Sequence, residues 1–286
     1  MSLSLSIVIP SHSRADLLAH CLASVARNKP FGTQVIVVDD GSNGKRVSQT
    51  AGNYPDVEVL RHVKAKGFCA AANAGIAAAT GDVVELLNDD AEVTSGWAEA
   101  ALAHFANPQI AAVAPLILQN DPSRQKAGLP PLIDSAGDEY DRGGFATKRF
   151  RGLECVHSSG PVWGASACAA FYRRTALLHA GGFPEHFGAY FEDVDLSFRL
   201  RKNGFEIWHE PMSVVWHRVS ASYGRRPGRA TLERQSANEE RVFWRNVGWR
   251  YLPRHAAVVA AKAVLRWEDG TIVPWATGRL RAVFGQ

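Results

Sequence analysis

The stretch LSIVIPSHSRADLLAHCLASVARN, residues 5–28, sets a short apolar run directly before a segment with helical periodicity. The run LSIVIP predicts a buried strand, and the segment after it carries apolar side chains three or four residues apart. Those side chains are Leu17, Leu18, Cys21, Leu22 and Val25. Further strands are predicted at QVIVVDD, VEVLRH, DVVELLNDD and IAAVAPLIL, and helices at CAAANAGIAAAT and residues 96–105. This alternation predicts a parallel sheet with helices on both faces.

The composition is that of an ordinary globular protein of 286 residues, of which 46% are hydrophobic and 21% charged. It predicts one domain with an appendage, or two small domains. The four cysteines are scattered without a CxxC pair, which indicates free thiols in a reducing compartment. The N-terminal residues lack a basic leader, and no run approaches the roughly 20 apolar residues of a membrane span. We therefore expect a cytoplasmic protein, or one attached to the cytoplasmic face of a membrane.

Polar residues follow three of the predicted strands where each strand ends. SHSR follows Pro10, Asp39 and Asp40 follow the second strand, and Asn88, Asp89 and Asp90 follow the fourth. Taken alone, DDGS at residues 39–42 is more typical of a turn. Because parallel sheets bind ligands outside the carboxyl ends of their strands, however, these residues are expected to converge on one site.

The stretch LNDDAEV, residues 87–93, ends a buried strand on two adjacent carboxylates, which repel each other unless a cation or donors compensate. A helix N-cap is the alternative, but the next helix is predicted to begin near Thr94 or Ser95, too late for Asp89 or Asp90 to cap it. A divalent ion that takes most ligands from phosphate and water needs only one or two protein carboxylates. The pattern favours a metal site. When no metal diphosphate is bound there, the carboxylates of Asp89 and Asp90 are expected to repel each other.

The second half of the chain carries further candidates, each with a structural alternative. Residues 120–156 are rich in Gly, Pro and charge and predict a long functional loop. FEDVDLSFRLRKNG predicts a helix whose first turn holds three carboxylates, which serve the helix dipole or include a general base. Strands are predicted at FEIWHE and SVVWHR. Trp163 and His217 are, on their local pattern alone, more typical of the core.

The C-terminal region is predicted to be mostly helical from residue 231, with interruptions at Pro253 and Pro274. Residues 215–286 hold 13 Lys and Arg against 5 Asp and Glu, a net charge of +8, whereas residues 1–214 carry −4. Together with four tryptophans, this charge fits a solvated helical extension first, an anionic membrane surface second and nucleic acid last.

In this order, the segments resemble the family 2 inverting nucleotide-sugar glycosyltransferases of the GT-A fold, especially rhamnosyltransferase-like bacterial members. The matching stretches are SIVIPSHSRADLLAHCLASV, VIVVDDGS, GFCAAANAGIAAATGDVVELLNDDAEVTSGW, GPVWGASACAAFYRRTALLHAGGFPEHFGAYFEDVDLSFRLRKNGFEIWHEP and VVWHRVSAS. The resemblance implies an α/β fold with a mixed, mainly parallel sheet, helices on both faces and a C-terminal helical extension. It implies a glycosyltransferase domain over residues 1–225, with a nucleotide-sugar half over 1–118 and an acceptor half over 157–225, and a basic extension over 226–286.

The resemblance also implies site roles. Asp40 would contact the nucleobase, Asp90 and His217 would bind the metal, and Asp193 would be the general base, with Glu192 beside the acceptor. The predicted nucleotide-sugar-binding residues are Pro10, Ser11, Arg14, Asp40, Lys66, Gly67, Asn73, Asn88, Asp89 and Asp90. The predicted acceptor-binding residues are Trp163, Gly164 and Glu192. Asn88 departs from the family's DxD element, because it stands where the first Asp is expected.

The implied activity is transfer of a sugar from a UDP-, dTDP- or GDP-linked donor to a saccharide or lipid-linked acceptor, with Mn²⁺ or Mg²⁺ and inversion at the anomeric carbon. Synthesis of bacterial polysaccharide, glycolipid or cell wall is the expected setting, with possible peripheral contact to the inner face of the cell membrane and no nucleic-acid partner. The alternatives are a sugar nucleotidyltransferase and a non-catalytic nucleotide-sugar-binding module. The first would ordinarily carry a Gly-rich basic loop after the first strand, where this chain has PSHSRADLL.

Overall fold

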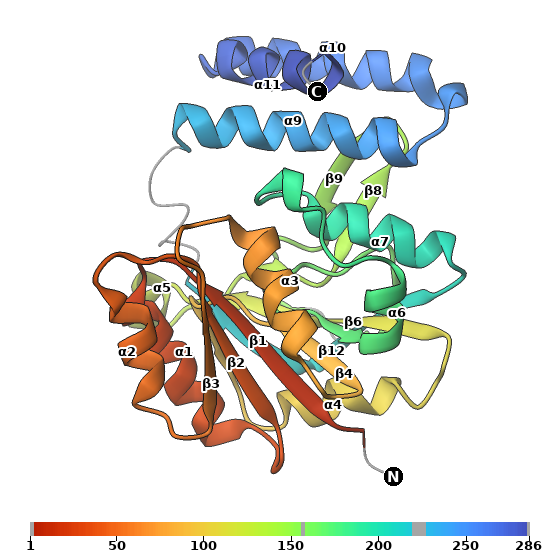
Figure 1. The fold of residues 1–286 in the computed structure, drawn as a ribbon. Coiled ribbons are helices and arrows are strands. Elements are labelled where there is room, and N and C mark those ends of the chain that lie inside the picture. The colour runs from red at the N-terminus through yellow and green to blue at the C-terminus, as the bar shows by residue number, and fades with distance from the viewer. Residues whose placement is uncertain (1–2, 156–157, 219–226, 285–286) are drawn as a thin grey trace.

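The computed structural model describes residues 3–155, 158–218 and 227–284. A central sheet carries its strands in the order β10-β12-β6-β11-β4-β1-β2-β3, with β5 paired to β12 and β7 to β6. Helices cover both faces of this sheet, and a separate layer of helices lies above it (Figure 1). The predicted helix-covered sheet with a C-terminal helical extension is thereby confirmed.

The N-terminal half supplies four parallel strands with β1 between β2 and β4. They are β1 (Leu5–Ser11), β2 (Gln34–Asp39), β3 (Val57–Arg61) and β4 (Val83–Leu86). Their connecting elements are α1 (Ala15–Asn28), η1 (Asn43–Lys45), α2 (Arg46–Gly52), α3 (Phe68–Ala78), β5 (Ala91–Val93) and α4 (Trp97–His104). One apolar core contains side chains of α1 and α4, and the opposite core contains side chains of α3. The Ala-rich composition of α3 lets it approach β1 closely, since a Cβ on Gly75 would lie 2.2 Å from Val8 Cγ1.

The second half makes the sheet mixed. The strand β11 (Phe171–Arg173) is antiparallel to both β4 and β6, whereas β6 (Ile110–Gln119) and β12 (Glu206–His217) are parallel to each other. The remaining elements of this half are β10 (Gly160–Val162), α6 (Arg174–His179), η2 (Glu185–Phe187) and α7 (Glu192–Lys202). The prediction of two strands at FEIWHE and SVVWHR is wrong. One strand, β12, spans both, because a register shift between Glu210 and Val214 accommodates Pro211 without ending the pairing.

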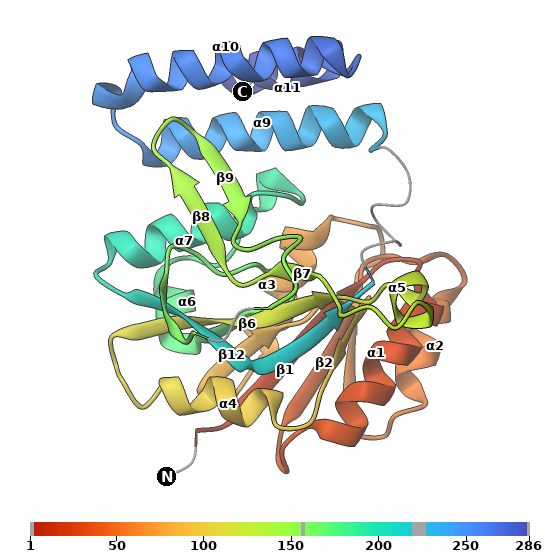
Figure 2. The ribbon, with the colours of Figure 1, turned by 180° about the vertical axis from the view of Figure 1, so that it is seen from behind.

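The stretch over residues 120–155 is more regular than predicted. It contains α5 (Pro122–Lys126), β7 (Ile133–Ser135), β8 (Asp138–Asp141) and β9 (Phe145–Lys148). The hairpin of β8 and β9 projects from the sheet toward the C-terminal helices (Figure 2). Its turn is held there because His255 Nδ1 lies 2.8 Å from the Gly143 carbonyl oxygen and Arg254 Nε donates to Asp141 at 2.9 Å.

The C-terminal layer consists of α9 (Arg229–Asn246), η3 (Trp249–Tyr251), α10 (Leu252–Glu268) and α11 (Ile272–Phe284). The predicted interruptions of the helical pattern lie just before Pro253 and Pro274, and both prolines stand in the first turn of the next helix, where proline removes no intrahelical hydrogen bond. Arg279 of α11 pairs with the buried carboxylates of Glu239 and Glu240 on α9. The layer is therefore tied to itself by buried ion pairs as well as to the hairpin below it.

Candidate active site

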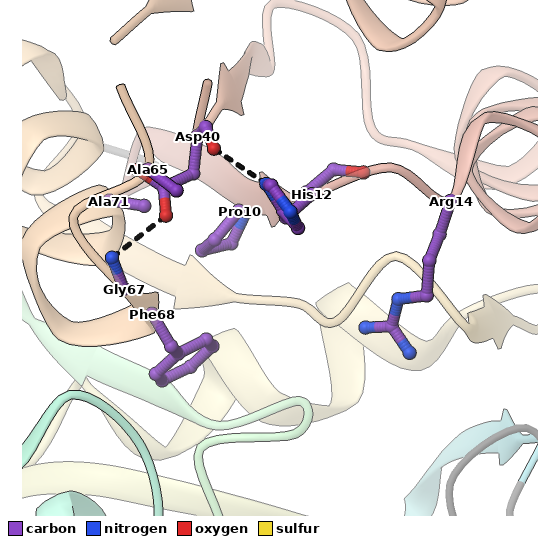
Figure 3. Close-up of a pocket in the computed structure, with 9 residues that line it drawn as sticks. Pro10, His12, Arg14, Asp40, Ala65, Gly67, Phe68 and Ala71 are labelled. Atoms are coloured by element: carbon purple, nitrogen blue, oxygen red, sulfur yellow. Dashed lines mark hydrogen bonds between the residues drawn. The ribbon is translucent and has the colours of Figure 1, made fainter. Parts of the chain in front are cut away.

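A pocket of about 250 Å³ opens at the carboxyl ends of β1 and β2, beside the N-terminus of α3 (Figure 3). Its walls are Pro10, Ser11, His12, Arg14, Asp40, Ala65, Gly67, Phe68 and Ala71. This is the edge at which parallel strands of an α/β sheet bind their ligands. The structure thus gathers five of the predicted nucleotide-sugar residues, Pro10, Ser11, Arg14, Asp40 and Gly67, around one cavity.

The adjacent aspartates at the end of β2 have different surroundings. Asp39 is fully buried and pairs with Arg61, and it accepts hydrogen bonds from Ser42 and Ser48. Asp40 lines the pocket and accepts the backbone N–H groups of Lys66 and Gly67 at 2.9 and 2.8 Å. Asp39 therefore stabilises the turn, whereas Asp40 fixes the pocket wall formed by residues 66–67.

The carboxylates after β4 are balanced inside the protein by Arg14. Its guanidinium lies 2.5 Å from Asp89 Oδ1 and 2.7 Å from Asp90 Oδ2, and Ser11 Oγ donates to Asp89 at 2.7 Å. Burial still raises the pKa of Asp89 to about 6. The expected mutual repulsion is present, since the charge of Asp90 also raises the pKa of Asp89, but Arg14 offsets it by pairing with both side chains, which the sequence did not reveal.

His217, at the end of β12, lies between two carboxylates. Its Nε2 lies 3.3 Å from Asp90 Oδ1, and its Nδ1 lies 2.9 Å from Asp134 Oδ2. Burial alone would raise the pKa of Asp90, but His217 and Arg14 outweigh it and hold the pKa below its usual value. The structure thus brings together the two residues predicted to bind metal, and it adds Asp134, which the sequence did not single out.

The arrangement fits a divalent ion that takes most of its ligands from substrate. Asp90 Oδ1 is buried and faces the Nε2 atom of His217 at 3.3 Å, so one carboxylate oxygen and one imidazole nitrogen point toward each other. A carboxylate behind the second imidazole nitrogen, here Asp134, is the usual partner of a metal-binding histidine. No group of three His, Cys, Asp or Glu residues in the described part of the chain is arranged to hold a metal by itself. An oxygen-preferring ion bound chiefly by a diphosphate needs no such group.

Asp193, in the first turn of α7, shares a lysine with Asp138 of β8, and the sequence did not indicate this lysine. Lys148 Nζ, from β9, lies 2.8 Å from Asp138 Oδ1 and 3.3 Å from Asp193 Oδ2. Asp193 Oδ2 also accepts the backbone N–H of Ala167 at 3.2 Å. Burial, followed by the nearby charge of Asp193, raises the pKa of Glu192 to about 8. At neutral pH the first turn of α7 therefore presents a protonated Glu192 beside a lysine-paired Asp193.

Other predicted residues lie in different surroundings. The Asn73 amide bonds to the backbone of Phe183, and Lys66 enters the site through its backbone. Trp163 stacks on Tyr140 with ring centroids 5.0 Å apart. Gly164 packs closely against Ser197, since a Cβ added to this glycine would lie 2.8 Å from Ser197 Oγ. The backbone N–H of Asn88 donates to the carbonyl oxygen of Cys168. These contacts give Asn73, Trp163 and Gly164 packing roles, while their predicted ligand contacts stay predictions.

Comparison with known sequences decides the family. The model of glycosyl transferase family 2 matches residues 6–179, more than half of the chain. The chain belongs to glycosyl transferase family 2. This membership favours the predicted activity over the nucleotidyltransferase alternative. No helix among the described residues is both long and apolar enough to cross a membrane.

Two relatives of this family 2 chain occur in Mycobacterium tuberculosis. A pre-mycofactocin glycosyltransferase is 34% identical over 215 residues, which are 74% of this chain but only 42% of that protein. The chain thus spans less than half the length of that relative. An N-acetylglucosaminyl-diphospho-decaprenol L-rhamnosyltransferase is 28% identical over 268 residues, covering 87% of each chain.

Solved structures share the fold of this family 2 chain. GalNAc-T7 with UDP, GalNAc and Mn²⁺ superposes with a TM-score of 0.65 at 19% identity, over 83% of this chain and 48% of that one. A mannosyltransferase from Pyrobaculum calidifontis with GDP-Man and Mn²⁺ gives 0.64 at 17% identity, over 99% and 87%. At such identities the likeness establishes the glycosyltransferase architecture alone.

Proposed function

We propose that this protein transfers a sugar from a nucleoside diphosphate sugar to an acceptor hydroxyl, with a divalent metal and inversion at the anomeric carbon. The observation that carries the proposal is the pair of Asp90 and His217, with Asp90 bound to Arg14 of the pocket wall and His217 bound to Asp134. Arg14 connects the pocket to Asp90, and Asp134 connects His217 to the vicinity of Lys148. Donor, metal and acceptor sites would thus follow one another along one edge of the sheet.

Asp90 and His217 would hold Mn²⁺ or Mg²⁺, which when bound neutralises the charge that develops on the departing diphosphate. Asp193 would accept the proton of the acceptor hydroxyl as that oxygen attacks the anomeric carbon. Glu192 suits this role less, since its raised pKa leaves it protonated at neutral pH and makes it a hydrogen-bond donor to the acceptor. A single displacement of this kind inverts the anomeric centre and needs no covalent sugar intermediate.

Asp193→Asn tests the assignment of the base. The amide keeps a similar shape but cannot take a proton, so transfer should fall by at least about a hundredfold, within the range of general-base contributions. Nucleotide affinity, measured by calorimetry with UDP, dTDP and GDP in the presence of Mn²⁺, should stay unchanged. Glu139→Gln, a change of an exposed acid on β8, is the matched control. Near-normal turnover of Asp193→Asn would exclude the proposed role.

For the acceptor, we propose a lipid-linked saccharide reached from the inner face of a bacterial membrane, in the synthesis of surface polysaccharide or glycolipid. Support comes from the substrate in the printed name of the second mycobacterial relative, and from apolar side chains exposed on the C-terminal layer. Trp249 of η3 is 79% exposed and Trp267, near the end of α10, is 75% exposed, and Val264 and Leu265 of α10 are exposed as well. Exposed tryptophans and aliphatic side chains in a region of net charge +8 suit an anionic bilayer surface.

Co-sedimentation with vesicles tests the membrane contact. The protein should bind vesicles that contain about one third phosphatidylglycerol at low salt, and binding should weaken at high salt because its electrostatic part is screened. Trp249→Ala combined with Trp267→Ala should reduce binding several-fold. Phe31→Ala, the loss of an exposed aromatic side chain outside the C-terminal layer, is the matched control. Absence of binding at low salt would refute the contact and leave the transfer activity untouched.

A further inference from the structure

The loop before α7 is held from two sides. On one side, the backbone N–H of Cys69, in the first turn of α3, donates to the Gly188 carbonyl at 3.0 Å. On the other, the Asn238 side chain of α9 donates through Nδ2 to the carbonyl oxygens of Phe187, Ala189 and Tyr190, each at 2.9 Å. The loop therefore spans the space between the nucleotide pocket and the C-terminal layer.

The segment that Asn238 holds is locally strained. Tyr190 and Phe191 have φ angles of 74° and 65°, in the left-handed region that residues other than glycine rarely adopt. Such conformations persist where surrounding contacts enforce them, each at roughly 1–3 kcal/mol. The strained pair directly precedes Glu192 and Asp193, and the Phe191 carbonyl accepts the N–H of Asp195. The strain therefore sets the direction in which the first turn of α7 starts.

The surroundings of Asn238 fix the orientation of its side-chain amide toward the loop. It is completely buried, and Arg241 donates to its Oδ1 at 2.8 Å. Because the arginine can only donate, it fixes the amide with Nδ2 toward the loop carbonyls. The helix that carries it is rigidly placed, since α11 packs so closely on α9 that a Cβ on Gly278 would lie 2.2 Å from the Glu233 carbonyl oxygen.

A second set of contacts joins α9 to α7. Arg245 and Asn246 donate to Oδ1 of the fully buried Asp195, at 3.1 and 2.9 Å. These contacts fix the body of α7, whereas Asn238 acts on the turn that leads into it. α9 therefore fixes the position of the strained turn through Asn238 and the position of α7 through Arg245 and Asn246.

We infer that Asn238 is a positioning residue for glycosyl transfer: α9 of the C-terminal layer holds the strained turn of residues 187–191 so that the carboxylates of α7 point into the site. This inference rests on the proposed function of Asp193 and Glu192. It makes the C-terminal layer a working part of the catalytic unit rather than an appendage.

The test is Asn238→Asp, which keeps the shape and the oxygen for Arg241 but removes both amide hydrogens. We expect kcat to fall about 10- to 100-fold, the range that a small misplacement of a catalytic group produces. Affinity for UDP, dTDP or GDP with Mn²⁺ should change less than threefold, because Cys69 still holds the Gly188 end of the loop. Gln235→Glu, the same chemical change one turn earlier on α9, should leave both quantities within twofold of the wild type.

Hydrogen exchange over residues 187–193, measured without substrate, gives a readout independent of turnover. Faster exchange in Asn238→Asp, in a protein with a cooperative unfolding transition, supports the inference, and exchange equal to the wild type overturns it. A kcat within twofold of the wild type also overturns it. If the acidic variant does not fold, Asn238→Ala carries the same measurements without an added charge. If the wild-type protein transfers no sugar, the proposed function fails, while the exchange measurement still decides whether Asn238 holds the turn.

Discussion

Glu85 lies in the middle of β4, three residues before the site stretch begins at Asn88, and its side chain is completely buried. Oε1 accepts the indole N–H of Trp97 at 3.0 Å, while Oε2 has no hydrogen-bond partner among the described residues. Burial raises the pKa of this carboxyl from 4.5 to about 8, and the Trp97 hydrogen bond offsets only part of that effect. Folded protein therefore holds a proton on Glu85 at neutral pH that unfolded protein has lost.

The pH dependence of stability follows from this difference. Below about pH 4.5 both states are protonated and Glu85 has no effect on the pH dependence. Between pH 4.5 and about 8 the folded state binds one more proton than the unfolded state, so the free energy of unfolding falls as pH rises. Above pH 8 Glu85 is ionised in both states, and the free energy of unfolding stays lower by a constant amount. This amount is about 5 kcal/mol in total if each pKa unit contributes about 1.4 kcal/mol. About 3 kcal/mol of the free energy of unfolding is lost between pH 5 and pH 8.

Glu85→Gln should remove that loss, since the amide oxygen can still accept the Trp97 hydrogen bond and never ionises. Urea unfolding at pH 5 and pH 8 measures it, and the difference between variant and wild type cancels the other titrating groups. We expect the variant to gain about 3 kcal/mol relative to the wild type on going from pH 5 to pH 8. Glu139→Gln, at an exposed position, should show no such gain. An identical pH dependence for Glu85→Gln and wild type would refute the assignment of a protonated buried acid.

Three further predictions concern the site. Asp90→Asn should lower Mn²⁺-dependent transfer at least a hundredfold. Metal-free nucleotide affinity, measured by calorimetry, should stay within threefold, because Asp90 does not line the pocket and Arg14, which does, keeps its pairing with Asp89. Asp40→Asn should weaken nucleotide binding about tenfold, because the single amide oxygen cannot replace both carboxylate oxygens that accept from Lys66 and Gly67. Unchanged affinity would show that Asp40 does not support this wall of the pocket. Lys148→Met should lower both kcat and the thermal unfolding midpoint, because it leaves Asp138 and Asp193 without their shared cation. A kcat within twofold of the wild type would show that this lysine does not serve the reaction.

The sequence predicted the N-terminal half best, because its strands and helices carry unmistakable periodicity. LSIVIP and QVIVVDD are buried parallel strands, and the polar residues that follow them meet at one pocket. The fold class and the meeting of Asp90 with His217 followed from the family resemblance, which supplied spatial relations that spacing alone could not.

The remaining contacts depend on tertiary packing without a local signature. Asp134, Asp138 and Lys148 lie in a stretch that was predicted to be an irregular loop. Asp134 reaches the site because β7 joins the main sheet beside β6, and Asp138 and Lys148 reach it because they lie opposite each other in the hairpin of β8 and β9. Nothing in ANEER, residues 237–241, indicates that Asn238 would meet a loop some fifty residues earlier in the chain. The three carboxylates of FEDVDL also differ in their surroundings, since Asp195 accepts hydrogen bonds from Arg245 and Asn246 of α9 and does not face the site.

Arg14 gives the acidic pair of residues 89–90 a built-in counter-ion. Its guanidinium pairs with one oxygen of each carboxylate, so part of their negative charge is balanced within the protein. A divalent ion at Asp90 Oδ1 would therefore gain only part of the attraction that two unpaired carboxylates would offer it, because Arg14 stays on Oδ2 and on Asp89. A bare divalent ion would gain little on these terms. An ion already chelated by a diphosphate also brings anionic oxygens that Arg14 can bind, so metal and donor are expected to enter together.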